Sequence, residues 1–256
     1  MTKACETLCA RAEHEVAHGK WLAAGDTESI WGWGTPAGRV RARRRARLIS
    51  DAACLGNGVR ALEIGCGTGL FTELFAATGA HLVAVDISTA LLAKARLRGL
   101  PPARVRFVAR PFEDCGLLGP FDAVIGSSVL HHLDYHRALA QIHDLLKPGG
   151  VLAFAEPNLL NPQVFLERKF RRLFPYVSPD ETAFVRRRLR RNLRAAGFVD
   201  RVIKPIDWLH PAIPALLIKA VSYIGSWLEA VPIIREFSGS LLISARRPKR
   251  SFRAAA

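Results

Sequence analysis

Three glycines at alternate positions, Gly65, Gly67 and Gly69, follow closely after the acid Glu63. Glycine adopts positive φ angles and lets a ligand approach the backbone without meeting a Cβ. The acid Asp86 comes about twenty residues later, a separation at which a carboxylate can bind both hydroxyls of a ribose. These residue types in this order predict a site that binds a nucleoside. A glycine turn that serves packing alone is the alternative.

The spacing of the glycines narrows the class of ligand. The dinucleotide-binding pattern is Gly-x-Gly-x-x-Gly, which brings a helix N-terminus against a pyrophosphate. Here the third position of that pattern holds Leu70. The spacing therefore favours a nucleoside without a pyrophosphate and argues against a nicotinamide-dependent oxidoreductase.

The flanking residues indicate which elements position these groups. An apolar run over residues 59–64 precedes the glycines, and apolar residues return at helical spacing over residues 70–75. This pattern predicts a strand, a glycine turn and a helix. A second buried strand over residues 80–88 places Asp86 near its carboxyl end. Ligands of open parallel sheets bind outside the carboxyl ends of the strands, so both groups meet at one edge.

Four motifs follow the order and spacing of one known family. They are residues 63–69, Asp86, residues 121–124 (Phe-Asp-Ala-Val) and residues 146–150 (Leu-Lys-Pro-Gly-Gly). As a set they resemble class I S-adenosylmethionine-dependent methyltransferases, over the stretch from residue 45 to residue 160. The resemblance implies an α/β fold, with a Rossmann-like, mostly parallel seven-stranded sheet and helices on both faces. It also implies S-adenosyl-L-methionine as the cofactor.

The resemblance carries cofactor-binding roles over to matching positions. The residues implied to surround the methionine part of the cofactor are Glu63, Gly65, Cys66, Gly67 and Gly69. Asp86, followed by Ile87, is implied to bind the ribose. Ser127 stands at the exit of a fourth strand, over residues 121–128, and is a further cofactor candidate.

Adenine recognition departs from the family pattern. After a third strand over residues 105–108, the family usually carries an acid that contacts the adenine amino group, and Pro111 stands at that position here. One interpretation is that Phe112 packs on the adenine while the backbone of Phe112 and Glu113 supplies hydrogen bonds. The other is that Phe112 belongs to the core.

Two adjacent histidines, His131 and His132, follow the fourth strand. Neighbouring side chains point in different directions, so we expect at most one of them to face the cofactor. His131 is the candidate general base, and a packing or hydrogen-bonding role is the alternative. His132 and Asp134 lack helical metal-ligand spacing, so the sequence predicts no metal site.

Two further segments supply candidates for the acceptor site. Glu156 and Asn158 follow a fifth strand over residues 151–155 and are candidates for orienting the acceptor, with a plain loop acid as the alternative. Trp31 and Trp33 lie among glycines in a loop. Large aromatic anchors in such a loop either form a flap over the acceptor or cap the core.

These assignments divide the chain into two parts. Residues 1–44 are a lead-in whose tryptophan loop covers the acceptor site, and residues 45–256 are the methyltransferase domain. The lead-in has few apolar positions over residues 1–27, which predicts a loosely packed helix.

The C-terminal part combines a basic helix with an apolar insert. Ser178, Pro179 and Glu181 have the types and spacing of a helix start, which predicts a helix over residues 182–196. Its outer face holds Arg186, Arg187, Arg188, Arg190, Arg191 and Arg194. Between a sixth and a seventh strand, residues 205–238 form an apolar helical insert that charges and prolines interrupt too often for a membrane span. The insert is either a lid over the site or partly immersed in lipid.

Composition bounds the partners and the compartment. The formal net charge of +15 over 256 residues predicts attraction to polyanions, either nucleic acid or an anionic membrane surface. The five cysteines are scattered, and no pair has metal-ligand spacing with a second pair to complete it. The first twenty residues lack the apolar core of a signal peptide. We therefore expect a reduced, cytoplasmic chain, with peripheral contact at the inner membrane surface as an open addition.

The sequence thus predicts methyl transfer from S-adenosyl-L-methionine to a small, hydrophobic or lipid-linked acceptor. The apolar insert, the basic helix and the tryptophan loop motivate this acceptor class. An RNA or other nucleic-acid methyltransferase and a non-catalytic S-adenosylmethionine-binding module are the alternatives. Nucleic acid is less favoured, because residues 126–129 read Gly-Ser-Ser-Val where base-amino methylators carry an Asn/Asp-Pro-Pro-aromatic turn. The sequence does not predict the oligomeric state.

Overall fold

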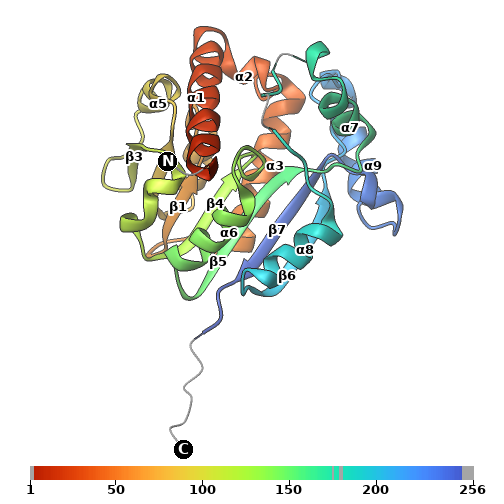
Figure 1. The fold of residues 1–256 in the computed structure, drawn as a ribbon. Helices are drawn as coiled ribbons and strands as arrows, with labels where there is room; N and C mark the ends of the chain where they lie inside the picture. The colour runs from red at the N-terminus through yellow and green to blue at the C-terminus, as the bar shows by residue number, and fades with distance from the viewer. Residues whose placement is uncertain (1–2, 175, 179–180, 250–256) are drawn as a thin grey trace, which may run out of the picture.

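The computed structural model describes residues 3–174, 176–178 and 181–249. Their strands form a seven-stranded sheet of order β3-β2-β1-β4-β5-β7-β6 (Figure 1). Neighbouring strands are parallel except at β7, which runs antiparallel to β5 and β6. The strands are β1 (Arg60–Ile64), β2 (His81–Asp86), β3 (Val105–Ala109), β4 (Phe121–Ser127), β5 (Leu146–Pro157), β6 (Val199–Ile206) and β7 (Ser240–Arg246).

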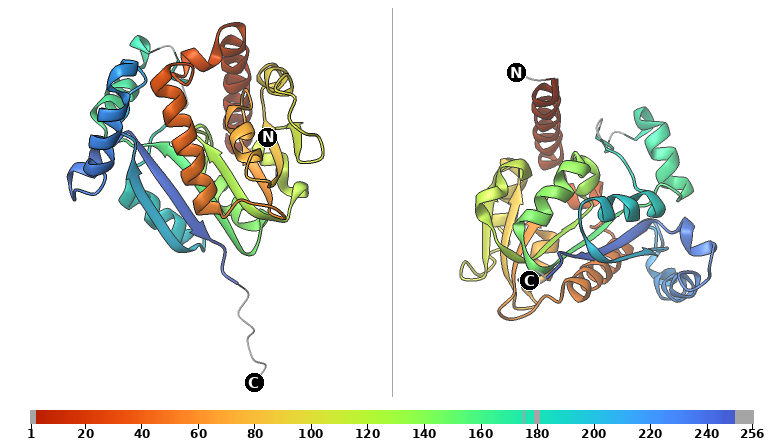
Figure 2. Two further views of the ribbon diagram at one scale, coloured as in Figure 1. Left: turned by 180° about the vertical axis from the view of Figure 1, so that it is seen from behind. Right: turned by 60° about the horizontal axis from the view of Figure 1, so that its bottom comes forward.

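Helices cover both faces of the sheet, which confirms the predicted fold class. Alternating side chains of a strand face opposite layers, so Ala61 packs with α3 (Pro36–Ala53), whereas Leu62 packs with α6 (Tyr135–Leu145). The face of α6 also carries α8 (Arg186–Ala195). Figure 2 shows α3 lying across the face that is hidden in Figure 1. Both layers are apolar, and together they hold the sheet rigid beneath the site.

The carboxyl ends of β1, β2 and β4 lie at one edge of the sheet because these strands are parallel. The chain passes from β1 to β2 on one side and returns to β4 on the other. Ligands of such sheets bind at this switch point. The glycine turn leads from β1 into α4 (Leu70–Ala76), and Ser88 caps α5 (Thr89–Arg96) directly after β2.

The N-terminal lead-in packs few side chains into the core: over residues 11–24 only Gly19 and Leu22 are buried. Its helices are α1 (Lys3–Ala24) and α2 (Thr27–Ile30). A Cβ on Gly19 would lie 2.6 Å from the Ser88 hydroxyl, so α1 lies directly against the start of α5. Lys94 Nζ donates to the Gly25 carbonyl at 2.7 Å, and Arg98 pairs with Glu28. Polar contacts therefore replace the apolar ones that the lead-in lacks.

The basic helix α8 starts at Arg186, four residues later than predicted. The preceding backbone bonds to His131 and to the end of β5 instead of forming a helical turn. The Thr182 N–H donates to the His131 carbonyl at 3.1 Å, and the Phe184 N–H donates to the Pro157 carbonyl at 3.0 Å. Pro179 lies outside the described residues. The extended course of residues 182–184 brings Glu181 into the site.

The insert between β6 and β7 contains η4 (Ala215–Leu217), α9 (Ile218–Leu228) and η5 (Ile234–Phe237). Ion pairs fasten it to α3, where Asp207 pairs with Arg41 at 2.6 Å and Glu229 pairs with Arg44 at 2.6 Å. Among the described residues, no helix is both long and apolar enough to cross a membrane. The remaining elements are η1 (Phe112–Leu118), η2 (Leu130–His132), α7 (Pro162–Lys169) and η3 (Arg171–Leu173).

Candidate active site

A cavity of about 610 Å³ lies at the carboxyl edge of the parallel strands. The glycine turn, the end of β2 and the start of η1 line one end of it. Helix α7 and residues 207–211 of the insert line another part, and α1 with the tryptophan loop contributes a further wall. The predicted cofactor edge and the tryptophan loop therefore share one continuous space.

The glycine turn can be built only with glycine. Gly65 and Gly67 have φ angles of 65° and 53°. A Cβ on Gly65 would lie 2.4 Å from the Val129 side chain, and a Cβ on Gly67 would lie 3.0 Å from the Trp31 ring. At these two positions glycine lets the backbone pack closely against Val129 and Trp31 while it borders the cavity. Trp31 lies over the glycine turn, so it borders the cofactor end of the cavity as well as any acceptor.

Asp86 is positioned as a ribose-binding carboxylate. One of its oxygens accepts the Gly67 N–H at 2.8 Å, and the other accepts the Ser88 N–H at 2.8 Å. Burial raises the pKa of Asp86, and these two N–H donors oppose that rise. Each carboxylate oxygen has a further lone pair that can accept a hydroxyl. Asp86 therefore ties the glycine turn to β2 and can still bind a sugar.

The other cofactor candidates divide into two groups. Those that line the cavity are Cys66, Ile87, Phe112, Glu113 and Ser127. Gly69 and Glu63 lie behind the lining: Gly69 starts α4, and Glu63 is 1% exposed in β1. Burial raises the pKa of Glu63 to about 8.

This raised pKa makes stability depend on pH. Below the ordinary pKa of 4.5, Glu63 is protonated in both states. Between 4.5 and about 8 the unfolded chain releases this proton while the folded chain keeps it, so the contribution of Glu63 to the free energy of unfolding falls as pH rises. We expect Glu63→Gln to lack this slope. Urea unfolding of both proteins at about pH 5 and about pH 8 measures it, and parallel pH profiles would contradict the assignment.

His131 and Glu156 form a buried pair at the end of the sheet. His131 Nδ1 lies 2.7 Å from Glu156 Oε2, and the two side chains are 3% and 0% exposed. The other Glu156 oxygen accepts the N–H groups of Val129 and Leu130 at 3.0 and 2.9 Å. Glu156 therefore lies beneath the lining and orients His131, which itself borders the cavity.

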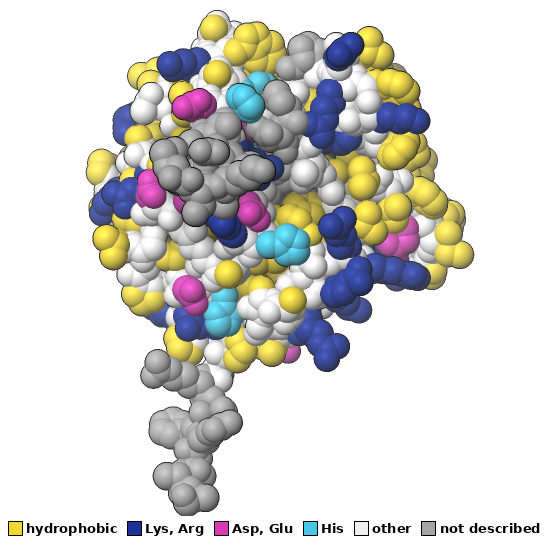
Figure 3. All heavy atoms as spheres, viewed as in Figure 1, with side chains coloured by type: hydrophobic (Ala, Val, Ile, Leu, Met, Phe, Trp, Pro, Cys, Tyr) yellow, Lys and Arg dark blue, Asp and Glu magenta, His cyan; other side chains and the backbone are white. Residues whose placement is uncertain are grey.

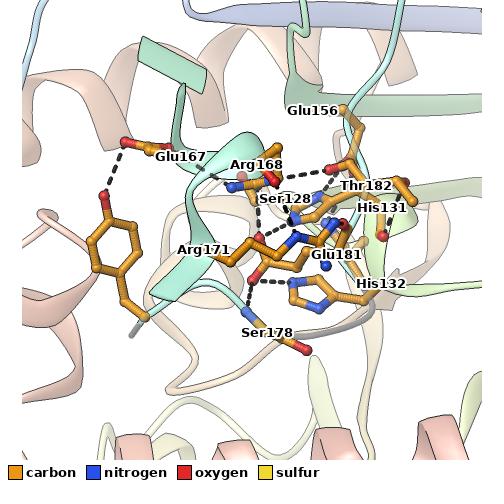
Figure 4. A network of polar contacts seen from close by, with 12 residues as sticks. Ser128, His131, His132, Glu156, Glu167, Arg168, Arg171, Ser178, Glu181 and Thr182 are labelled. Atoms are coloured by element: carbon orange, nitrogen blue, oxygen red, sulfur yellow. Dashed lines mark hydrogen bonds and ion pairs between the residues drawn. The ribbon is translucent and has the colours of Figure 1, made fainter. Parts of the chain in front are cut away.

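The site also contains a polar network that the sequence did not predict (Figure 4). Glu181 lies 3.6 Å from His131 Nε2 and 3.8 Å from His132 Nε2, and Arg168 of α7 pairs with it at 2.7 Å. On the other side, His132 Nδ1 lies 3.1 Å from Glu15 of α1. These residues come from four separate segments, and their types show no spacing that would connect them in the sequence.

Both histidines line the cavity. That at most one of them faces the cofactor stays a prediction. They lie in the single turn of η2, where their ring centroids are 4.3 Å apart and their planes meet at 38°. A 3₁₀ turn rotates neighbouring side chains less far apart than a strand does. The two rings therefore approach Glu181 from the same side.

The network shifts the protonation of its members. Burial alone lowers the pKa of His131, but the carboxylates of Glu156 and Glu181 outweigh it and raise the pKa to about 9. For Glu181, burial raises the pKa, and contacts with His131, His132 and Arg168 lower it to about 2. At neutral pH His131 thus carries a proton on each nitrogen, and its role as a general base stays a prediction.

The remaining acceptor candidates have structural partners. The Asn158 amide donates to the carbonyls of Glu236 and Ser238 at 2.7 and 2.8 Å, which holds the end of the insert. Trp33 borders the cavity and is 9% exposed, with the guanidinium groups of Arg41 and Arg45 each 5.1 Å from its ring. Trp33 therefore connects α3 to the acceptor end, whereas Asn158 lies outside the lining.

Comparison with known proteins agrees with this geometry. Residues 62–152 match the family model described as a methyltransferase domain. This stretch covers the glycine turn, Asp86 and both histidines. This match and the strand order agree with the resemblance to the class I S-adenosylmethionine-dependent methyltransferases.

The chain is also similar to individual proteins. Over 138 residues the chain is 38% identical to the ubiquinone biosynthesis O-methyltransferase of Xylella fastidiosa. The aligned stretch covers 50% of this chain and 55% of that protein. The chain thus spans about half the length of the curated relatives it matches. In structure it resembles the N-methyltransferase NodS of Bradyrhizobium japonicum with bound S-adenosylhomocysteine (TM-score 0.61, 20% identity, 92% of this chain and 100% of that one). A Mesorhizobium loti methyltransferase gives a TM-score of 0.60 at 20% identity, over 78% of this chain and 96% of that one.

Proposed function

We propose that the chain transfers a methyl group from S-adenosyl-L-methionine to a small, hydrophobic or lipid-linked acceptor. The continuous cavity carries this proposal, because it connects the glycine turn and Asp86 to α7 and the insert. The name of the Xylella relative, a ubiquinone biosynthesis O-methyltransferase, is consistent with a quinone-like acceptor.

The residues of the cavity act mainly by binding and positioning. The sulfonium of the bound cofactor supplies an electrophilic methyl group. Asp86 and the glycine turn hold the nucleoside, and the acceptor wall aligns the nucleophile. Such alignment can contribute about 7–11 kcal/mol to lowering the barrier. A base is needed only where the acceptor atom must lose a proton.

The acceptor end favours a hydrophobic partner. Helix α7 lines the cavity with Val164, Glu167 and Arg168, while its outer side exposes Phe165 and Leu166. The insert shows the same division, since its residues 208–211 line the cavity and its later residues expose apolar side chains. The same two segments therefore border the active site and present apolar surface outward, which suits entry of a lipid-like molecule.

We further propose that this surface contacts an anionic membrane from the cytoplasmic side. Exposed apolar side chains of the insert are Leu216, Tyr223, Ile224, Trp227 and Ile233. Lys169 of α7, Lys219 of the insert and Arg172 of η3 are exposed as well. Figure 3 shows hydrophobic and basic side chains intermixed at the right, over α7, α8 and α9. An apolar patch with basic neighbours binds a membrane by burial and by attraction to anionic lipids.

The arginines of α8 do not favour a nucleic-acid acceptor in the same way. None of them lines the cavity. They contribute to the basic surface instead, where Arg186 pairs with Glu236 at 2.8 Å. Contacts between a nucleic acid and these arginines would therefore not by themselves bring a base into the cavity.

Flotation with vesicles tests the membrane contact. We expect the chain to bind phosphatidylglycerol vesicles and not phosphatidylcholine vesicles. Replacing Leu216 and Trp227 with Glu should weaken binding at least tenfold, because burying one such side chain contributes about 1.5–3 kcal/mol. Leu97→Glu, at a side chain that is 86% exposed at the end of α5, is the matched control. Equal binding by both variants would contradict the proposed surface.

Methyl transfer itself is tested with methyl-labelled S-adenosylmethionine. The full chain is incubated with a lipid extract, a quinone-precursor fraction and RNA in parallel. The proposal predicts label in the organic phase of the first or second reaction. Label confined to RNA would overturn the acceptor class, and an absence of label in every reaction would support the non-catalytic module instead.

A further inference from the structure

His131, His132 and Glu181 meet in the wall of the cavity (Figure 4). One potential ligand atom from each residue lies within 4.8 Å of the other two. The shortest approaches are 3.6 Å, from His131 Nε2 to Glu181 Oε2, and 3.8 Å, from His132 Nε2 to Glu181 Oε1. Ligand atoms at about 2.0–2.2 Å from one metal ion lie roughly 3–3.5 Å apart. Small side-chain rotations therefore bring this set to coordination distance.

The opposite nitrogen of each ring is already bound to a carboxylate. His131 Nδ1 lies 2.7 Å from Glu156, and His132 Nδ1 lies 3.1 Å from Glu15. Metal-binding histidines almost always donate their other ring N–H to such a partner, which orients the ring and makes the free nitrogen a better ligand. Both rings of this cluster thus have the supporting contacts that metal-binding histidines have.

Glu181 retains capacity for a cation. Arg168 contacts its Oε2 at 2.7 Å, and the Ser178 N–H donates to its Oε1 at 2.8 Å. A carboxylate offers about four lone-pair positions, so these contacts leave room for a metal bond. The carboxylates of Glu15 and Glu156 add negative charge, which a dication would balance once His131 has released its Nε2 proton.

We propose that His131, His132 and Glu181 bind a divalent transition-metal cation of the Zn²⁺ type. Two imidazoles and one carboxylate suit such metals, whereas Mg²⁺ and Ca²⁺ prefer oxygen ligands throughout. Binding releases the protons held on the ligand atoms. The cluster borders the cavity, so a remaining coordination position faces the acceptor space. If methyl transfer is the function, as proposed above, an oxygen of the acceptor is the natural further ligand.

The test is a calorimetric titration of the full-length chain with Zn²⁺ after dialysis against EDTA. We expect one saturable site that millimolar Mg²⁺ does not block. His132→Ala and Glu181→Gln should each weaken Zn²⁺ binding at least about 100-fold, and Glu15→Gln about 10-fold to 100-fold. His81→Ala, at an exposed histidine that begins β2 at the other edge of the sheet, is the matched control and should bind as the wild type does.

Binding of S-adenosylhomocysteine is measured on every variant, which separates a lost metal site from a misfolded chain. A wild-type chain that binds S-adenosylhomocysteine but shows no saturable Zn²⁺ site would overturn the proposal. Unchanged Zn²⁺ affinity in both His132→Ala and Glu181→Gln would overturn it as well. Zn²⁺ binding in a chain that transfers no methyl group would leave the metal site standing and reject the proposed function alone.

Discussion

Asp86→Ala is expected to bind S-adenosylhomocysteine at least about 100-fold more weakly than the wild-type chain, because each of two hydrogen bonds to a charged group contributes about 1.5–3 kcal/mol. The carboxylate lies at the cavity edge with one hydrogen bond from Gly67 and one from Ser88. Its remaining lone pairs are the ones that can hold the two ribose hydroxyls. Equilibrium dialysis with labelled S-adenosylhomocysteine measures the change.

Two variants control this measurement. Asp86→Asn keeps the shape of the side chain and one acceptor oxygen, so its affinity should fall between those of the wild type and Asp86→Ala. Asp51→Asn changes an exposed carboxylate on α3 and should leave the affinity unchanged. Wild-type affinity in a well-folded Asp86→Ala protein would show that the nucleoside binds elsewhere.

Glu156→Ala should lower the free energy of unfolding by about 3–5 kcal/mol, the usual cost of removing one partner from a buried ion pair. Glu156 is fully buried, and its two oxygens bind His131 and the backbone N–H groups of Val129 and Leu130. Its loss leaves these donors without their acceptor in a dry environment. Urea unfolding followed by circular dichroism gives the value.

The matched control for this change is Glu73→Ala. Glu73 pairs with Arg98 at 2.5 Å, but its side chain is 52% exposed. An exposed ion pair contributes only about 0–1 kcal/mol, so the control should unfold close to the wild type. Equal losses in both variants would mean that Glu156 does not hold the end of the sheet as its contacts indicate.

Much of the fold could be predicted because its signals are local. The strand, glycine turn and helix over residues 59–75 are encoded by hydrophobic spacing and by positions that tolerate only glycine. Asp86 could be located because parallel strands bring their carboxyl ends to one edge. The strand order and the antiparallel β7 agree with the family resemblance.

The parts that the sequence did not predict depend on contacts between distant segments. Glu15, Arg168 and Glu181 reach the histidines from α1, α7 and a loop, and no local period connects them. The capping signal at Ser178 predicted a helix start several residues before the observed one. The backbone of residues 182–184 bonds to His131 and to the end of β5 instead of forming a helical turn. The Glu181 side chain does accept the Ser178 N–H, so half of the capping pattern is present without the helix.

The lead-in makes contacts that its apolar pattern does not indicate. Its apolar residues are few, and Glu15 bonds to Ser178 and His132, while Gly19 allows α1 to touch Ser88. Hydrophobic periodicity does not register such polar contacts. The resulting wall places α1 over the cavity, where it contributes to the site as well as to stability.

The central claim is that the cavity at the glycine turn and Asp86 holds the nucleoside of S-adenosylmethionine. Calorimetric titration of the wild-type chain with S-adenosylhomocysteine, and separately with NAD, tests it most directly. The account predicts saturable binding of S-adenosylhomocysteine at one site per chain and no binding of NAD. Heat from NAD alone, or from neither compound in a folded chain, would contradict it.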